Sequence, residues 1–467
     1  MGKPEVDNLA PMSDAGLEQA RSKMAEAGVD PVAIDVFEHY YRLVESGETG
    51  MIPESTIEPV DMPSLADVDA PKTADALGGT AVIKLNGGLG TSMGLDRVKS
   101  LLEVREGLTF LDVIARQVLA AREEHGVRLP LVFMDSWRTR QDTTEALAGY
   151  DLAVEGLPLD FLQNREPKLR ADDLTPVEWE KDPELEWCPP GHGDLYTALR
   201  GTGLLDRLIE AGFERAFVSN SDNLGATPDP AVAAWFADSG APFAIEAVRR
   251  TPSDRKGGHF ARRTSDGRIV LRETAQTLEE DQEALADLSR HRFCSTNNLW
   301  FDLVAMRDEL DRRDGILGLA LIKNTKTVDP SDPESPEVIQ IESAMGAAIE
   351  VFEGAQLIEV TRERFLPVKT TNDLLVLRSD CYSLTGSHHL ALADGVEQVP
   401  FVDLDSAHYK LVHEFDRRFP EGVPSLRRAE QLVVEGDWTF GADVTVVGDA
   451  RLGSEGGQVE SGTTLGG

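Results

Sequence analysis

The sequence is short of cysteine, of basic residues and of long apolar runs. Its three cysteines, Cys188, Cys294 and Cys381, are scattered along 467 residues, so they form neither a disulfide framework nor a zinc-binding spacing. Lysine and arginine total 46 against 82 aspartate and glutamate residues, which gives a formal charge of −36. A surface of this sign repels nucleic acids and anionic lipid headgroups, so we expect neither a nucleic-acid partner nor a membrane partner.

The sequence also lacks a membrane-spanning pattern and an export signal. No run of about 18 uncharged apolar residues occurs, and the first residues contain no basic stretch followed by an apolar one. The chain is nevertheless 41% hydrophobic, and its apolar runs alternate with turn residues. This composition is typical of a folded globular protein and excludes disorder, collagen and coiled coil. We expect a soluble, cytoplasmic protein.

The apolar pattern predicts three regions. Residues 1–80 contain two helices, at 13–26 and from Pro31 onwards with Asp30 as the cap, followed by an extended arm rich in proline and serine. Residues 81–380 alternate short apolar strands with helices, which predicts an α/β core with a doubly wound, mostly parallel sheet. Residues 381–467 end in short β-branched pieces separated by glycines, which favours a small β-helix-like domain. The predicted core strands include 81–85, 131–134, 159–163, 216–219 and 243–248, and the clearest core helix is 110–124.

The strongest local signal is a glycine-rich loop at the end of the first core strand. Leu85 and Asn86 lead into Gly87 and Gly88, two further glycines follow, and Lys99 comes next. Without Cβ atoms, the backbone N–H groups of such a loop can approach a phosphate or a base closely, and the lysine adds a positive charge. The spacing matches neither a Walker A loop nor the dinucleotide-binding fingerprint, and an ordinary glycine-rich turn stays open as an alternative.

A second signal is a histidine between two glycines. Gly191 and Gly193 flank His192 after two prolines, which makes the imidazole accessible to a ligand, and Asp194 is expected to cap the helix that follows. Taken alone, the histidine can equally be a plain loop residue.

A third signal is a polar segment directly after an apolar strand. Asp222 follows Asn220 and Ser221 there, at the carboxyl end of a predicted sheet strand, where ligands of α/β sheets bind. Magnesium needs only one or two carboxylates when phosphates supply other oxygens, although an Asx-rich turn would have the same composition.

Weaker signals lie further along the chain. Glu273 closes a short strand, and Asn297 and Asn298 are groups that hydrogen-bond sugar hydroxyls. Lys369 ends an apolar segment and could contact a second phosphate. Because the chain mostly uses arginine, a lysine inside such a motif suggests a task for a compact ammonium group.

Together, these motifs resemble the eukaryotic-type UTP–glucose-1-phosphate uridylyltransferases, also called UDP-glucose pyrophosphorylases. The similarity runs from about residue 81 to the C-terminus, whereas the N-terminal helices and the linker match the family only loosely. The resemblance implies a nucleotidyltransferase core, a C-terminal β-helical domain, and Mg²⁺-assisted formation of UDP-glucose and pyrophosphate from UTP and glucose 1-phosphate. The matching blocks, in the family's order, are KLNGGLGTSMG, LTFLD, PPGHGD, SNSDNLGA, TNNLW, GAAI, RFLPVK and VEGDWTFGADV.

The resemblance also implies a role for each motif residue. Lys99 and Lys369 would be the catalytic cations, Asp222 would ligate magnesium, and Gln163 would read uracil. The UTP contacts would be Leu85, Asn86, Gly87, Gly88, Lys99, Gln163, Gly191, Asp222 and Lys369. The contacts with glucose phosphate would be His192, Asn220, Ser221, Glu273, Asn297 and Asn298.

Two other functions stay open. A pyrophosphorylase for another sugar 1-phosphate, such as a UDP-N-acetylhexosamine or broad UDP-sugar enzyme, would share most of the motifs. A non-catalytic nucleotide sensor could keep the fold, but it would not need to retain Lys99, Asp222 and Lys369 together. The sequence leaves a homo-oligomer open as well, because the glycine-rich tail after Gly448 matches the family poorly.

Overall fold

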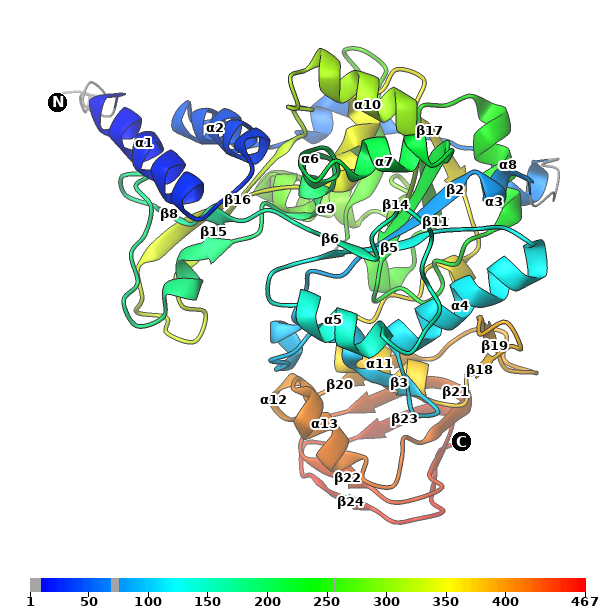
Figure 1. Cartoon of the computed structure of the whole chain (residues 1–467). Helices are drawn as coiled ribbons and strands as arrows, with labels where there is room; N and C mark the ends of the chain where they lie inside the picture. The colour runs from blue at the N-terminus through cyan, green and yellow to red at the C-terminus, as the bar shows by residue number, and fades with distance from the viewer. Residues whose placement is uncertain (1–9, 69–74, 256) are drawn as a thin grey trace. The chain divides into compact units, whose positions relative to one another are not determined.

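The structure is a computed structural model and describes residues 10–68, 75–255 and 257–467 (Figure 1). The described residues form two compact parts. No helix in this portion of the chain is both long and apolar enough to cross a membrane. The first part lies within Met1–Ile83, Val154–Val218 and Pro230–Val360, and the second within Lys84–Ala153, Ser219–Asp229 and Thr361–Gly467.

The first part begins with two helices that pack against each other, α1 (Ala10–Glu26) and α2 (Pro31–Glu45), drawn in blue in Figure 1. The Asp30 carboxylate accepts a hydrogen bond from the Val32 N–H at 2.9 Å, so the predicted cap of the second helix is confirmed. The buried faces of both helices form one apolar cluster with a neighbouring three-stranded sheet, through Leu169, Leu321, Ile339 and Ile341.

The main sheet of the first part has the strand order β17-β11-β14-β10-β2. β11 (Phe243–Arg249) is parallel to β17 (Gln356–Glu359), whereas β14 (Phe293–Asp302) is antiparallel to both β11 and β10 (Arg215–Asn220). The predicted α/β class is confirmed, and the sheet is mixed because of the antiparallel strand β14. Both β10 and β2 (Thr80–Leu85) continue into the second part.

Two smaller sheets complete the first part. In one, β1 (Ile57–Pro59) pairs with β12 (His259–Arg263), which pairs with β13 (Ile269–Arg272). The predicted extended arm at 47–79 therefore contains a strand, and its residues 69–74 lie outside the described residues. The other sheet has the order β15 (Leu321–Thr327), β16 (Glu337–Ser343), β8 (Leu169–Arg170). The remaining elements are α3 (Asp75–Gly78), β6 (Asp160–Leu162), β7 (Glu166–Pro167), β9 (Trp187–Cys188), α6 (Leu195–Gly201), α7 (Leu204–Glu210), α8 (Pro230–Ser239), α9 (Gln282–Ala286) and α10 (Leu303–Arg312).

The second part starts where the first core strand ends. The Asn86 N–H donates to the Met134 carbonyl oxygen at 2.8 Å, which places β5 (Leu131–Asp135) beside the end of β2. The predicted core helix is present as α4 (Phe110–His125), which begins at a capping box between Thr109 and Asp112. The other elements before the C-terminal strands are β3 (Glu103–Arg105), β4 (Leu108–Thr109), α5 (Arg140–Leu147), α11 (Thr371–Arg378), β18 (Tyr382–Leu384) and β19 (Leu390–Leu392).

The C-terminal strands, orange to red in Figure 1, pair in parallel. Ser425 lies opposite Thr445, and Thr445 lies opposite Thr464, so the chain returns to the same sheet at regular intervals. One sheet has the order β20-β21-β23-β25, and β22 pairs with β24. These elements are β20 (Phe401–Leu404), α12 (Ser406–Tyr409), α13 (Val412–Arg418), β21 (Ser425–Val434), β22 (Trp438–Phe440), β23 (Thr445–Leu452), β24 (Gly457–Val459) and β25 (Thr464–Gly466).

Candidate functional site

Asn86 supports the glycine-rich loop from inside the second part. Its buried side chain donates to Asp135 Oδ1 at 2.9 Å and to Thr143 Oγ1 at 2.8 Å. The side-chain oxygen Asn86 Oδ1 accepts a hydrogen bond from Ser100 Oγ at 2.6 Å. The side chain thus fixes the loop to β5 and α5, while Gly88 is exposed at the surface. A direct contact of Asn86 with UTP stays a prediction.

The loop then curves around Lys99. The Lys99 N–H donates to the Gly88 carbonyl oxygen at 3.2 Å. Gly90 has a φ of 67°, and a Cβ at that position would lie 2.9 Å from Leu95 Cδ1 and 3.3 Å from Lys99 Cβ. Because a side chain would be both strained and crowded there, glycine is required for the loop to hold the lysine in this place.

Lys99 is bound by two oxygen atoms of the second part. Its ammonium group lies 2.6 Å from Asp222 Oδ2 and also donates to the Val368 carbonyl oxygen. The Asp222 side chain is 24% exposed, so solvent reaches the ion pair. The predicted metal ligand and the predicted phosphate-binding cation are therefore neighbours. The Asp222 carboxylate and the Val368 carbonyl oxygen already bind one cation, the ammonium group of Lys99.

Lys369 follows in the same stretch of backbone. The Val368 N–H donates to the Asp222 carbonyl oxygen at 3.2 Å, and Asn223 Oδ1 accepts from the Leu366 N–H at 2.8 Å. These bonds hold the segment before Lys369 against the segment of Asp222. The Lys369 side chain is exposed, and no acid pairs with its ammonium group among the described residues. It is therefore accessible to an anionic ligand.

Lys84 is a residue whose importance the sequence analysis missed. It lies on β2, is 1% exposed, and donates to Ser219 Oγ and to the Ala226 carbonyl oxygen, both at 2.7 Å. Ser219 and Ala226 lie on either side of Asp222 in the chain, so Lys84 holds both ends of the segment that contains Asp222. Its position in an otherwise apolar strand was the available signal.

Ser221 and Asn220 lie between Ser219 and Asp222. Ser221 is 4% exposed, and its Oγ has no hydrogen-bond partner among the described residues. Its N–H donates to the Leu85 carbonyl oxygen at 3.0 Å. Asn220 ends β10 and is partly exposed. A buried hydroxyl without a partner is costly, which suits a bond to a ligand oxygen.

In the first part, the conformation of the His192 loop depends on its two glycines. Gly191 has a φ of 79°, and a Cβ there would lie 2.5 Å from the Ser343 carbonyl oxygen. A Cβ on Gly193 would lie 2.2 Å from Ser343 Oγ. The loop therefore packs closely on the end of β16, which only glycine allows.

This packing fixes the tautomer of His192. The Met345 N–H donates to His192 Nδ1 at 2.9 Å, so Nδ1 is an acceptor and the ring proton lies on Nε2. Burial lowers the pKa of His192 to about 4. At neutral pH the imidazole is uncharged and offers Nε2–H as a hydrogen-bond donor.

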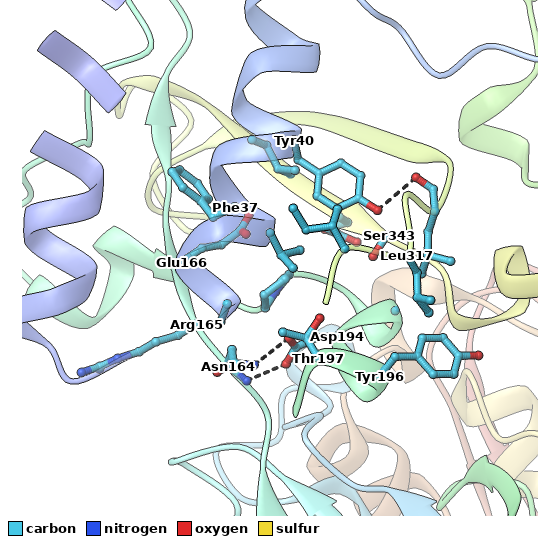
Figure 2. Close-up of a pocket in the computed structure, with 18 of the residues that line it drawn as sticks. Phe37, Tyr40, Asn164, Arg165, Glu166, Asp194, Tyr196, Thr197, Leu317 and Ser343 are labelled. Carbon is cyan, nitrogen blue, oxygen red and sulfur yellow. Dashed lines mark hydrogen bonds between the residues drawn. The ribbon is translucent and has the colours of Figure 1, made fainter. Parts of the chain in front are cut away.

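The predicted capping role of Asp194 is wrong. Its side chain makes no capping bond to α6 and instead accepts from the Asn164 N–H at 2.6 Å and from Asn164 Nδ2 at 2.8 Å, as the dashed lines in Figure 2 show. The Asp194 carboxylate binds Asn164, which is distant in sequence, and not the N-terminus of α6, as the local sequence predicts. Gln163 directly follows β6 and is partly exposed. It precedes Asn164, the residue that Asp194 holds in place.

The predicted sugar contacts lie at a bulge and at a strand end. Between Ile245 and Ala247 the register of β11 against β14 shifts, and Asn297 has a φ of 57°. Asn298 is fully buried and donates to Glu246 Oε2 at 2.9 Å. Glu273 directly follows β13 and is partly exposed. Contacts of these residues with glucose stay predictions.

A second cluster with metal-binding residue types is better explained as an ion-pair network. Glu54, His259 and His291 come close together in the first part. However, the Glu54 carboxylate lies 2.7 Å from Arg272 Nη2 and 2.6 Å from Arg290 Nε, and Arg272 Nε donates to His259 Nε2 at 3.1 Å. Burial alone would raise the pKa of Glu54, but the histidine and arginines outweigh it and lower that pKa. Because arginines supply the positive charge, this cluster does not call for a metal ion.

The predicted site residues therefore form two groups. Within the second part, Lys99, Asp222 and the segment of Lys369 come together. Within the first part, the His192 loop and the strand end at Gln163 are joined through Asp194. The second part also holds Leu85, Asn86, Gly87, Gly88, Asn220 and Ser221, and the first part also holds Gly191, Glu273, Asn297 and Asn298.

Comparisons with known proteins cover nearly the whole chain. The family model described as UTP–glucose-1-phosphate uridylyltransferase matches residues 34–447. The UTP–glucose-1-phosphate uridylyltransferase of Saccharomyces cerevisiae is 38% identical over 379 residues, which are 81% of this chain and 74% of the yeast protein. The enzyme of the same name from Hordeum vulgare is 34% identical over 456 residues, covering 95% of this chain and 93% of the barley protein.

Solved structures agree with this result. A variant of the UDP-glucose pyrophosphorylase of Leishmania major, in complex with UDP-glucose, has a TM-score of 0.91 and 42% sequence identity, and the match covers 97% of this chain and 98% of that one. A structure named UDP-glucose phosphorylase, from Trypanosoma brucei, has a TM-score of 0.91 and 41% identity, with 97% and 98% of the two chains covered. The chain belongs to the UTP–glucose-1-phosphate uridylyltransferase family.

Proposed function

We propose that this protein is a UTP–glucose-1-phosphate uridylyltransferase that forms UDP-glucose and pyrophosphate reversibly. Its membership of the family supports the activity. The single structural observation that carries the proposal is the arrangement of Lys99, Asp222 and the Val368 carbonyl oxygen beside Lys369. The reaction brings two polyanions together, and this is where the chain concentrates groups that bind anions and cations.

We propose that Mg²⁺ is the cofactor and that Asp222 is its ligand. A carboxylate and a carbonyl are the hard oxygen donors that Mg²⁺ prefers, and here they already bind an ammonium group. When bound, the metal would neutralise negative charge on the phosphates of UTP. A metal ion bound to Asp222 would compete with Lys99 for the Asp222 carboxylate. The ammonium group of Lys99 would therefore turn from Asp222 towards the triphosphate.

The chain's own residues then position both substrates. Leu85, Gly87 and Gly88 would line the nucleotide, while Gln163 and Gly191 would bind uracil. His192 would donate Nε2–H to the phosphate of glucose 1-phosphate, and Asn220 and Ser221 would also bind this phosphate. Glu273, Asn297 and Asn298 would bind the hydroxyl groups of glucose.

No protein nucleophile is needed in this mechanism. A phosphate oxygen of glucose 1-phosphate attacks the α-phosphorus of UTP, the bond from that phosphorus to the bridging oxygen breaks, and pyrophosphate leaves with that oxygen. Lys99 and Lys369 stabilise the charge that shifts towards the leaving group. The catalytic contribution of the protein is orientation and electrostatic stabilisation.

The proposal extends to the organisation of the protein. We assign residues 1–80 to an N-terminal region, 81–380 to the catalytic core and 381–467 to a segment that ends in a β-helical domain. The parallel pairing of the C-terminal strands supports the last assignment. A cytoplasmic location and the absence of nucleic-acid and membrane partners stay predictions, and a homo-oligomer stays open as an alternative to a monomer.

The activity itself is tested by pyrophosphate release. We expect pyrophosphate from UTP and glucose 1-phosphate in the presence of Mg²⁺, and none in excess chelator. N-acetylglucosamine 1-phosphate should be a poor substrate in a parallel assay. Faster turnover with N-acetylglucosamine 1-phosphate than with glucose 1-phosphate would show that the enzyme uses another sugar 1-phosphate. No turnover with any sugar 1-phosphate would refute the proposal.

Lys369 should act mainly on the chemical step. Lys369→Ala should lower kcat by about 100-fold with little change in either KM, because the lost charge faces the transition state. Lys369→Arg should not restore full activity, since a planar guanidinium replaces a compact ammonium. The exposed Lys410 of the same part provides the control, and Lys410→Ala should be neutral. A Lys369→Ala enzyme with normal kcat would show that this lysine is structural.

Gln163 should act on nucleotide binding. Its amide offers both a donor and an acceptor to the O4 and N3–H edge of uracil. Gln163→Ala should therefore raise the KM for UTP far more than the KM for glucose 1-phosphate. Gln141→Ala, at an exposed glutamine of α5, is the control. Equal changes in both KM values would contradict the assignment.

A further inference from the structure

Asp194 joins the two segments that we assign to uracil and to the glucose phosphate. It lies two residues after His192 in the same loop, and both of its carboxylate oxygens bind Asn164, the residue after Gln163. One bond goes to the Asn164 backbone at 2.6 Å and the other to its side chain at 2.8 Å. A carboxylate that holds the backbone N–H and the side chain of one residue fixes both its position and its orientation.

The Asp194 end of this linkage is buried, and Asn164 is partly exposed. Asp194 is 5% exposed, and it lines a cavity of about 30 Å³ together with Asn164, Glu166 and Ser343 (Figure 2). A space of that size holds about one or two water molecules. Loss of the two bonds to Asn164 would therefore leave the buried carboxylate of Asp194 without these hydrogen-bond donors, which is costly.

We propose that Asp194 is a positioning residue that sets the location of Gln163 relative to Gly191 and His192, and thereby determines how well the enzyme selects uracil. The inference rests on the proposed function, because it assigns a role to the residues that would bind UTP. Asp194 itself lines the cavity behind the loop and acts through Asn164.

The electrostatic surroundings make this link sensitive to pH. Burial raises the pKa of Asp194 to about 7, although the bonds from Asn164 lower it in part. Protonation would convert one carboxylate oxygen into a hydroxyl group, and one of the two accepted bonds would be lost. Ligand affinity should therefore fall as the pH drops through about 7. The titratable and charged groups that line the same cavity lie on several elements around it, and His192 lies in the loop itself. They are Tyr40 on α2, Arg165 and Glu166 around β7, Tyr196 on α6, and Glu342 on β16.

The test compares Asp194→Asn with the wild type. The amide keeps the size of the side chain but presents an NH₂ group to one of the two donors of Asn164. We expect the ratio of kcat/KM for UTP over CTP to fall by about tenfold, as for the loss of one hydrogen bond to a charged group. Asp173→Asn is a matched control, because Asp173 also accepts from the backbone and side chain of one residue, Thr175, in another loop.

A double variant separates positioning from a loss of folding. In Asp194→Asn combined with Asn164→Asp, the backbone N–H of residue 164 can bond to the amide oxygen, and the amide NH₂ can bond to the new carboxylate. All donors and acceptors are satisfied again, so the double variant should regain most of the UTP over CTP selectivity. A double variant no better than Asp194→Asn would overturn the proposal.

Calorimetry with UDP-glucose provides a readout that does not depend on turnover. The two phosphates of UDP-glucose do not titrate between pH 6 and pH 8, so a change in affinity reports on the protein. The wild type should bind UDP-glucose more weakly at pH 6 than at pH 8, and Asp194→Asn should lose most of this difference. An equal pH dependence in both proteins would overturn the inference while leaving the proposed function intact. Failure of the wild type to bind UDP-glucose at all would instead refute the proposed function.

Discussion

The contact of Lys99 with Asp222 and the Val368 carbonyl oxygen is the interaction on which the candidate site in the second part depends. A protein with a formal charge of −36 has to bind two polyanions, and charges separated by more than about 8 Å are screened at physiological ionic strength. The few cations close to the phosphates must therefore dominate. Asn86 braces the loop that curves around Lys99, and Lys84 holds the segment of Asp222 at both ends. These buried bonds explain how one partly exposed ion pair keeps a fixed geometry.

The His192 loop of the first part presents a neutral hydrogen-bonding group instead of a charge. Packing of the glycine loop on Ser343 puts His192 where the Met345 N–H selects its tautomer, and burial keeps the ring uncharged. Asp194 connects this loop to the strand end at Gln163. The residues that we propose for charge stabilisation and those that we propose for substrate selection thus form different groups, each supported by its own hydrogen bonds.

Local patterns in the sequence predicted the elements whose signals are local. The cap at Asp30, the strand before the glycine loop and the helix at residues 110–124 were all found where a short pattern favours them. The site motifs could be proposed because residue type and order can be read in the sequence, and their contacts with the substrates stay predictions. Partners distant in sequence could not be predicted, and Asp194, which suits a helix cap, binds Asn164 instead. The bulge at Asn297, the burial of Asn298 and the role of Lys84 also depend on strand pairing that no local pattern specifies.

The most direct test of the account is to locate the cation. Crystals grown with UTP and Mn²⁺ allow the ion to be found by its anomalous scattering, without any assay of activity. The account predicts an ion at about 2 Å from a carboxylate oxygen of Asp222, with the Lys99 ammonium moved away from Asp222 and onto the triphosphate. An ion bound elsewhere, with the pair between Lys99 and Asp222 intact, would contradict it.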